Sequence, residues 1–225
     1  MQFSPFHRYV MEAWQGVPSA QRFLGICYTL GSFVEKDDNM AFFWYYRAAE
    51  QDDAVAQHML GLCYVIGRVV EKNIEKVLFW WRKAAAQGNA DAQCEIGIAY
   101  FHGLGVEDNP AEAVELWRKA AKQDFVRAIN CIGVVYSQGD GVKQDYAEAA
   151  KWYAKAAELG DSDASLWLGL CYQKGEGVEK NLEKAKELYQ KAAKLGSLHA
   201  ALLFRLLNTA DGMKPEGNSG KDFLS

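Results

Sequence analysis

Apolar and small residues recur along this chain at a fixed interval of 36 residues. Ala128 and Ala164 are one such pair, and each is followed by a glycine five positions later and a tyrosine eight positions later. A fixed period of this length is typical of a solenoid, in which each unit buries its apolar face against its neighbours. The period predicts one all-α domain, an α/α superhelix of five helix-turn-helix repeats, at residues 20–55, 56–91, 92–127, 128–163 and 164–199.

Within each repeat the pattern predicts two helices joined by a loop. The first helix carries apolar residues three and four positions apart, as in Leu168, Cys171 and Tyr172, and ends near a glycine. The second helix follows an Asp or an Asn, residue types that cap helix N-termini. The predicted caps are Asp37, Asn73, Asn109, Asp145 and Asn181.

A few positions depart from the repeat. Asp52 and Asp124 stand where the other repeats end in glycine, so we expect left-handed turns there at some energetic cost. Phe33 and Val69 replace the second glycine of the loop, so the first two loops are expected to differ in shape from the other three.

The two ends of the chain lie outside the full repeats. Residues 1–19 are predicted to hold a capping helix, which is the second half of an incomplete repeat. The solenoid with its last capping helix is predicted to cover 20–208, and Arg205 indicates that this last helix faces solvent. Residues 209–225 are rich in Gly, Pro, Ser and charge without periodicity, so we expect a disordered tail.

Charge and hydropathy restrict the partners and the compartment. A formal net charge of -4 and the absence of a Lys/Arg cluster argue against nucleic acid as a partner. No stretch approaches the 18 or so apolar residues of a membrane-spanning helix, and the N-terminus lacks a signal-peptide pattern. We therefore expect a cytoplasmic protein without membrane insertion, and secretion by a route that needs no N-terminal signal stays open.

Candidate catalytic chemistry is sparse. No two of the four histidines have the i, i+4 spacing of a metal site, and the glycine-rich loops follow helices and lack the Lys-Ser/Thr pair of a phosphate loop. The five cysteines are expected to be reduced core thiols, because equivalent positions on stacked helices are too far apart for a disulfide. We therefore predict no enzyme activity and no catalytic, cofactor or metal site.

Taken together, the repeat positions give the pattern A-x-x-x-L-G-x-x-Y-x-x-G-x-G-V-x-x-(D/N)-x-x-x-A-x-x-x-(W/Y)-x-K-A-A-x-x-G. This pattern resembles the Sel-1-like repeat, a relative of the tetratricopeptide repeat, over about residues 5–208. The resemblance implies a right-handed superhelix of antiparallel helix pairs whose first helices line a concave groove. It also implies an adaptor role in signalling, secretion or host contact, and it implies no substrate.

The groove that this resemblance implies is apolar in its N-terminal half and polar in its C-terminal half. Leu30, Val65, Ile66 and Phe101 are apolar at places where later repeats carry polar residues, which suggests a contact patch. The alternative, that the N-terminal helix or a second copy of the chain covers them, stays open. The predicted partner-binding residues are Arg22, Leu30, His58, Val65, Ile66, Phe101, His102, Asn130, Gln138, Gln173 and Lys174.

The function predicted from these features is a non-catalytic scaffold or adaptor that binds a peptide or a protein surface in its groove. One alternative is an inhibitor or immunity-type protein that blocks a single partner. Another is a secreted effector that binds a host protein. A homodimer formed through the apolar groove patch is a further alternative.

Overall fold

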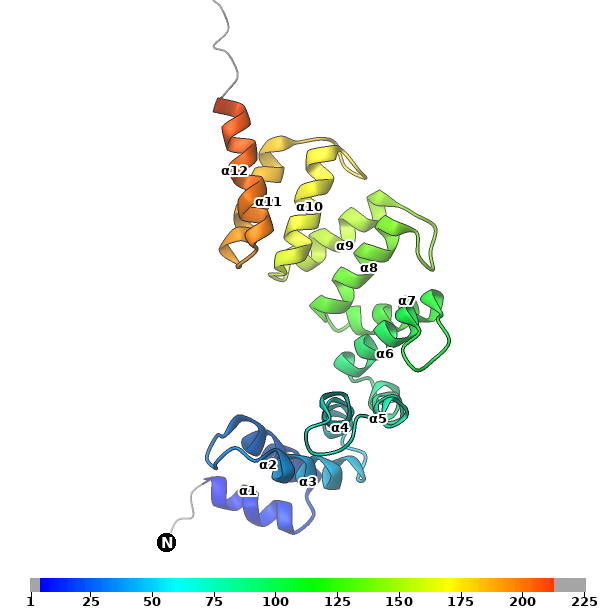
Figure 1. Cartoon of the computed structure of the whole chain (residues 1–225), viewed down its shortest axis with the longest axis vertical. Helices are drawn as coiled ribbons and strands as arrows, with labels where there is room; N and C mark the ends of the chain where they lie inside the picture. Colours follow the sequence, from blue (N-terminus) through cyan, green and yellow to red (C-terminus); the bar gives the residue numbers. More distant parts are fainter. Residues whose placement is uncertain (1–4, 213–225) are drawn as a thin grey trace, which may run out of the picture. The chain divides into compact units, whose positions relative to one another are not determined.

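The computed structural model describes residues 5–212, with side chains for residues 5–209, and these residues form helices and turns (Figure 1). The all-α fold and the repeated helix pairs confirm the sequence prediction. The helices are α1 Pro5–Trp14, α2 Pro18–Leu30, α3 Asp38–Ala49, α4 Ala54–Ile66, α5 Ile74–Ala86, α6 Ala90–His102, α7 Pro110–Ala121, α8 Val126–Gln138, α9 Tyr146–Glu158, α10 Ser162–Lys174, α11 Leu182–Lys194 and α12 Leu198–Gly212.

The chain divides into two compact units. Unit 1 comprises residues 1–132 and 140–143, and unit 2 comprises residues 133–139 and 144–225. In unit 1 the buried side chains of α3, α4 and α5 form one continuous cluster that includes Tyr45, Leu60 and Trp81. In unit 2 buried residues of α10 and α11 pack with α12 around Tyr189.

The predicted N-cap residues all cap their helices. Asp37 Oδ1 accepts hydrogen bonds from the backbone N–H of Asn39 and Met40, at 2.8 and 3.1 Å. The other four caps accept one backbone hydrogen bond each at the start of the second helix: Asn73 from Lys76, Asn109 from Glu112, Asp145 from Glu148 and Asn181 from Lys184. Each bond satisfies a donor that the first helical turn leaves without a partner.

The glycine in the middle of each first helix permits close packing against the aromatic ring of the second helix. A Cβ atom at Gly25 would lie 2.5 Å from Cε1 of Tyr45, and one at Gly169 would lie 2.6 Å from Cε1 of Tyr189. Gly61 lies in the same way against the indole of Trp81. A side chain at the glycine would therefore collide with the ring, which explains why the glycine recurs wherever the ring does.

A ladder of glutamine side chains connects successive helix pairs in unit 1. Gln57 is fully buried, donates to the backbone oxygen of Ala49 at 3.2 Å, and accepts from Gln87 Nε2 at 2.8 Å. Gln21 and Gln93 make equivalent bonds to the helices beside them, and accept from Gln51 and Gln123 respectively. Each of the three buried amides is paired with a backbone carbonyl and with the amide of an exposed glutamine, so its burial is compensated.

Backbone dihedral angles test the positions that depart from the repeat. Asp52 and Asp124 have φ angles of 61° and 55°, which confirms the left-handed turns predicted there. Phe33 has a φ of 68°, within a few degrees of the glycines at the same place in later loops, so the prediction that the first loop differs in shape is wrong at this residue. Its ring stacks on Phe6 at 5.3 Å between centroids, a contact that offsets the strained backbone.

The last helix is longer than predicted, because α12 continues to Gly212 and so includes the first four residues of the predicted tail. The rest of that tail, residues 213–225, lies outside the described residues. Arg205 is exposed, and so are Leu198, Leu202 and Leu206, which follow one another at helical spacing.

Candidate protein-binding surface

Three apolar side chains are exposed at the C-terminal ends of α2 and α4, the first helices of the first two repeats. Leu30 of α2 is 69% exposed, and Val65 and Ile66 of α4 are 43% and 54% exposed. We call these three residues the apolar patch. Later repeats carry His102, Gln138 and Lys174 where Leu30 and Ile66 stand, and all three of these polar side chains are exposed. The fold therefore does not require an apolar residue at that place.

A cavity of about 240 Å³ lies beside the patch. Thr29 of α2, Met59, Leu62 and Ile66 of α4, and the buried Ala41 and Tyr45 of α3 line it. Two charged side chains of its lining, Asp38 and Arg68, form an exposed ion pair with 3.7 Å between Oδ2 and Nη1. The arrangement offers an apolar recess with a polar edge, which suits one aliphatic or aromatic side chain of a partner.

Phe101 belongs to the core more than to the patch. It is half-buried, and its ring packs against Trp117 with 5.6 Å between centroids. Trp117 donates its indole N–H to the backbone oxygen of Cys94 and so needs no polar neighbour on the groove side. Phe101 thus has a contact within the chain that Leu30 and Ile66 lack, and its part in partner binding stays a prediction.

Arg22 is held by an internal ion pair. Its Nη1 donates to Asp53 Oδ2 at 2.9 Å, and Asp53 also caps α4 through Oδ1. The side chain of Asp53 is 9% exposed, so the pair is partly shielded from water. Arg22 thus joins α2 to the start of α4, and a partner would have to compete with Asp53 for its guanidinium.

His58 is much less accessible than a groove residue is expected to be. It is 9% exposed and stacks on Trp81, with ring centroids 6.1 Å apart. Its Nε2 is buried and has no hydrogen-bond partner among residues 5–209. Burial lowers the pKa of His58, and the carboxylates of Asp91 and Glu95 oppose this effect only in part. The imidazole is therefore neutral near pH 7.

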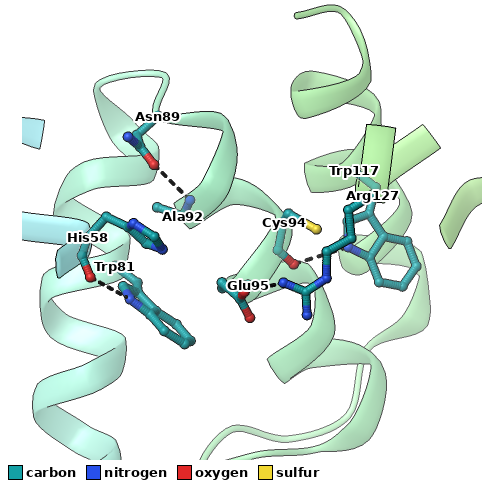
Figure 2. Close-up of polar contacts among 8 residues, drawn as sticks. All are labelled: His58, Trp81, Asn89, Ala92, Cys94, Glu95, Trp117 and Arg127. Carbon is teal, nitrogen blue, oxygen red and sulfur yellow. Dashed lines mark hydrogen bonds and ion pairs between the residues drawn. The ribbon is translucent and has the colours of Figure 1, made fainter. Parts of the chain in front are cut away.

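The helix next to His58 carries a charged pair that the sequence analysis did not single out. Glu95 of α6 accepts a hydrogen bond from Arg127 of α8, and Figure 2 shows the His58 ring and the Arg127 guanidinium directed toward α6 from its two sides. Asp91, one turn before Glu95, makes no ion pair within the described residues. The i, i+4 spacing of Asp91 and Glu95 in the sequence could have indicated that these two carboxylates lie on one face of α6.

The remaining predicted residues lie in different surroundings. His102 is exposed and meets Phe101 edge to face, and Asn130 is half-buried. In unit 2, Gln138 is exposed, Gln173 is half-buried and accepts a hydrogen bond from Tyr189 Oη, and Lys174 lies 3.6 Å from Glu176. Gln138, Gln173 and Lys174 belong to unit 2, whereas the apolar patch belongs to unit 1.

The described residues offer little for catalysis. They contain no group of three or more His, Cys, Asp or Glu side chains placed to hold a metal ion. All five cysteines are free, and burial raises the pKa of Cys63 and of Cys171 to about 11. The pKa of Cys94 is raised as well, by a hydrogen bond with Cys131 and by burial. Thiols of this kind are protonated at neutral pH and are poor nucleophiles.

Comparison with known proteins decides the family. The family model described as the Sel1 repeat matches residues 18–53, 54–89, 90–125, 127–161 and 162–197. The chain belongs to the Sel1 repeat family. Sel1 repeat proteins typically mediate protein–protein interactions and are generally non-catalytic. A search of curated proteins found no match.

Solved structures with Sel1 repeats are similar to this chain over most of its length. A protective antigen from uropathogenic Escherichia coli is 33% identical with a TM-score of 0.84, over 92% of this chain and 44% of that one. A Sel1 repeat protein from Oxalobacter formigenes is 37% identical with a TM-score of 0.82, over 91% of this chain and 81% of that one. This chain thus spans less than half of the Escherichia coli antigen.

A third structure is similar in fold alone. The immunity protein Pa5087 from Pseudomonas aeruginosa is 19% identical with a TM-score of 0.57, over 86% of this chain and 76% of that one.

In the described part of the present chain, no helix has the length and apolar character needed to cross a membrane.

Proposed function

We propose that this Sel1 repeat protein is a non-catalytic scaffold that binds a peptide or one face of a folded protein on the first helices of unit 1. The observation that carries the proposal is the exposure of Leu30 and Ile66 at a place where the other three repeats have polar side chains. Since the fold does not require these apolar residues, a contact outside the chain accounts for them.

The energetics indicate what such a contact needs. Fully burying a Leu or Ile side chain contributes about 1.5–3 kcal/mol, and association costs at least about 4 kcal/mol in lost freedom of motion. The exposed area of the apolar patch alone therefore supports only weak binding. The cavity beside Ile66 supplies a second apolar contact, because a partner side chain inserted there would meet Leu62 and Tyr45.

The experiment is an affinity capture from the native cell extract with three forms of the protein. The test variant is Leu30→Asp with Ile66→Asp. The matched control is Leu104→Asp with Leu159→Asp, which adds the same charge at side chains that are 50% and 44% exposed. Circular dichroism establishes that each form is folded.

A partner that binds the wild type and the control but is lost from the test variant supports the proposal. Retention of every partner by the test variant contradicts it and directs attention to other surfaces. The stoichiometry of the captured complex distinguishes a scaffold with several clients from a protein that blocks one partner. If light scattering finds a wild-type dimer that the test variant cannot form, a second copy of the chain covers the patch.

A further inference from the structure

The loop between α4 and α5 lacks a contact that closes the later loops of the chain. In the loop after α6, Gly105 packs directly against the first residue of α5, so that a Cβ atom added to it would lie 2.4 Å from Cγ1 of Ile74. The next two loops repeat the contact, as Gly141 with Pro110 and Gly177 with Tyr146. In the loop between α4 and α5 the corresponding pair is Val69 with Asp38, and valine carries the Cβ atom that this contact excludes.

Val69 also gives this loop a different backbone path. The residues at its place in the other four repeats have left-handed φ angles, namely Phe33 at 68°, Gly105 at 70°, Gly141 at 72° and Gly177 at 72°. Val69 has no positive φ, which confirms the prediction that the second loop differs in shape. A β-branched residue is strongly disfavoured in the left-handed region, so this loop does not close on α3 as the later loops close on their helices.

The cavity of about 240 Å³ lies where this contact is missing, since both Asp38 and Val69 belong to its lining. We call this cavity the recess. Asp38 is itself a departure from the repeat, because the other second helices begin with Ile74, Pro110, Tyr146 and Leu182. Two positions that meet in the later repeats thus depart together, and they leave a recess that the fold does not require.

The size and the walls of the recess suit a ring. The half-buried part of its lining, which a group from outside the chain can reach, includes Met59, Leu62, Cys63 and Val69. An apolar cavity of about 150 Å³ holds a benzene molecule. The recess is larger, at about 240 Å³, and therefore has room for the ring of a Phe or a Trp side chain.

Two features of the lining favour an aromatic ring over an aliphatic side chain. The thioether of Met59 makes favourable contacts with aromatic rings. Lys36 and Arg68 are exposed cations of the lining, and a cation is attracted to the face of an aromatic ring. The ion pair of Arg68 with Asp38 is exposed and 3.7 Å long, so it holds the guanidinium only weakly. An aromatic side chain in the recess would gain contacts that a leucine would not.

We propose that the recess binds one aromatic side chain, a Phe or a Trp, of the protein partner. This inference rests on the proposed function, because Ile66 belongs both to the lining of the recess and to the apolar patch. It identifies the partner as a segment that carries an aromatic residue for the recess beside an aliphatic residue for the rest of the patch.

The test begins with a selection of random 12-residue peptides displayed on phage, against the full-length wild-type protein. Enriched peptides are synthesised in two forms, one as selected and one with leucine in place of the aromatic residue. Their affinities are measured for the wild type and for Asp38→Ile with Val69→Gly, a variant that reproduces the contact of Ile74 with Gly105 and so closes the recess.

The matched control is Asp108→Ile with Leu104→Gly. It makes the same kind of change at two exposed residues of the next loop, which do not line the recess. Circular dichroism and urea denaturation establish that both variants are folded.

A second measurement needs no variant of the protein. With the methionine methyl groups labelled with carbon-13, NMR reports on Met59 in the recess and on Met11 of α1, whose side chain is 60% exposed. A peptide ring in the recess should shift the Met59 signal and leave the Met11 signal in place. The leucine form of the peptide should give a much smaller shift of Met59.

We expect the enriched peptides to share a Phe or a Trp. Its replacement by leucine should weaken binding to the wild type and to the control about tenfold, and binding to the variant with the closed recess less than about twofold. Three results would overturn the inference: enriched peptides without an aromatic residue, an equal loss with the open and the closed recess, or a Met59 signal that responds alike to both forms of the peptide.

The Leu30→Asp, Ile66→Asp variant separates this inference from the proposed function. Peptides that lose binding to this variant but bind equally well with leucine in place of the aromatic residue contradict only the aromatic preference of the recess. Peptides that bind this variant as well as the wild type, or the absence of any enrichment, contradict the proposed function itself.

Discussion

The hydroxyl of Tyr189 donates a hydrogen bond to Oε1 of Gln173, with 2.5 Å between the two oxygens. The same pairing of a second-helix tyrosine with a polar first-helix residue recurs as Tyr153 with Ser137 and as Tyr45 with Thr29. In the two repeats that have tryptophan instead, the first-helix residue is apolar, as Val65 or Phe101. The polarity of this groove position therefore follows the ring behind it.

This relationship predicts a favourable coupling between Phe101 and Trp117. Phe101→Ser and Trp117→Tyr should each destabilise the fold, since the first removes the ring contact and the second introduces a hydroxyl without a partner. Together they recreate the Tyr153–Ser137 pair. The double variant should therefore lose about 1 kcal/mol less stability than the sum of the losses in the two single variants. Urea denaturation of the four forms measures this coupling. In the control, Leu104→Ser in an exposed loop takes the place of Phe101→Ser and is combined with Trp117→Tyr. The coupling in this control should be below about 0.5 kcal/mol, and a coupling equal to that of Phe101→Ser with Trp117→Tyr would refute the relationship.

The glutamine ladder makes a second prediction. Gln57→Ala removes the acceptor of Gln87 Nε2 and one of the two donors to the backbone oxygen of Ala49, which keeps only the N–H of Asp52. We expect the free energy of unfolding to fall by about 1–3 kcal/mol. Gln190→Ala, on an exposed side chain, should change it by less than about 0.5 kcal/mol. Guanidinium denaturation of both variants decides the matter, and similar losses for both would show that the ladder contributes nothing specific.

His58 predicts how stability changes with pH. Burial lowers the pKa of this histidine in the folded state, so the unfolded chain binds the proton more tightly. The contribution of the neutral His58 to the stability of the fold is fully present at pH values above the pKa of histidine in the unfolded chain, about 6.5. It is lost as the pH falls below 6.5 through the lower pKa of the folded state. The wild type should therefore lose more stability than His58→Leu between pH 7.5 and pH 5. Denaturation curves of both forms at the two pH values test this, and a parallel loss would mean that the His58 pKa is not lowered.

Local backbone requirements made most of the fold predictable from the sequence. The capping residues such as Asp37, and the left-handed turns at Asp52 and Asp124, each satisfy a demand within a few residues of the chain, so the 36-residue register locates them. Phe33 was misjudged because its ring stacks on Phe6, a contact between residues 27 positions apart that offsets the strain.

The candidate surface was less predictable because it depends on contacts between repeats. The register identifies His58 as a groove-facing position but does not reveal that Trp81 covers one face of its ring. It likewise identifies Phe101 as apolar without indicating its contact with Trp117. Leu30 and Ile66 are exposed, and each is the last residue of its helix, a position that the register locates.

The most direct test of the docking surface is photo-crosslinking in living cells with p-benzoylphenylalanine in place of Ile66. Leu159 is the control position, because its exposure of 44% is close to the 54% of Ile66 and it lies in unit 2. We predict a discrete cross-linked protein band from position 66 that is absent at position 159. A band from position 159 without one from position 66 would contradict the proposal that the apolar patch of unit 1 holds the partner.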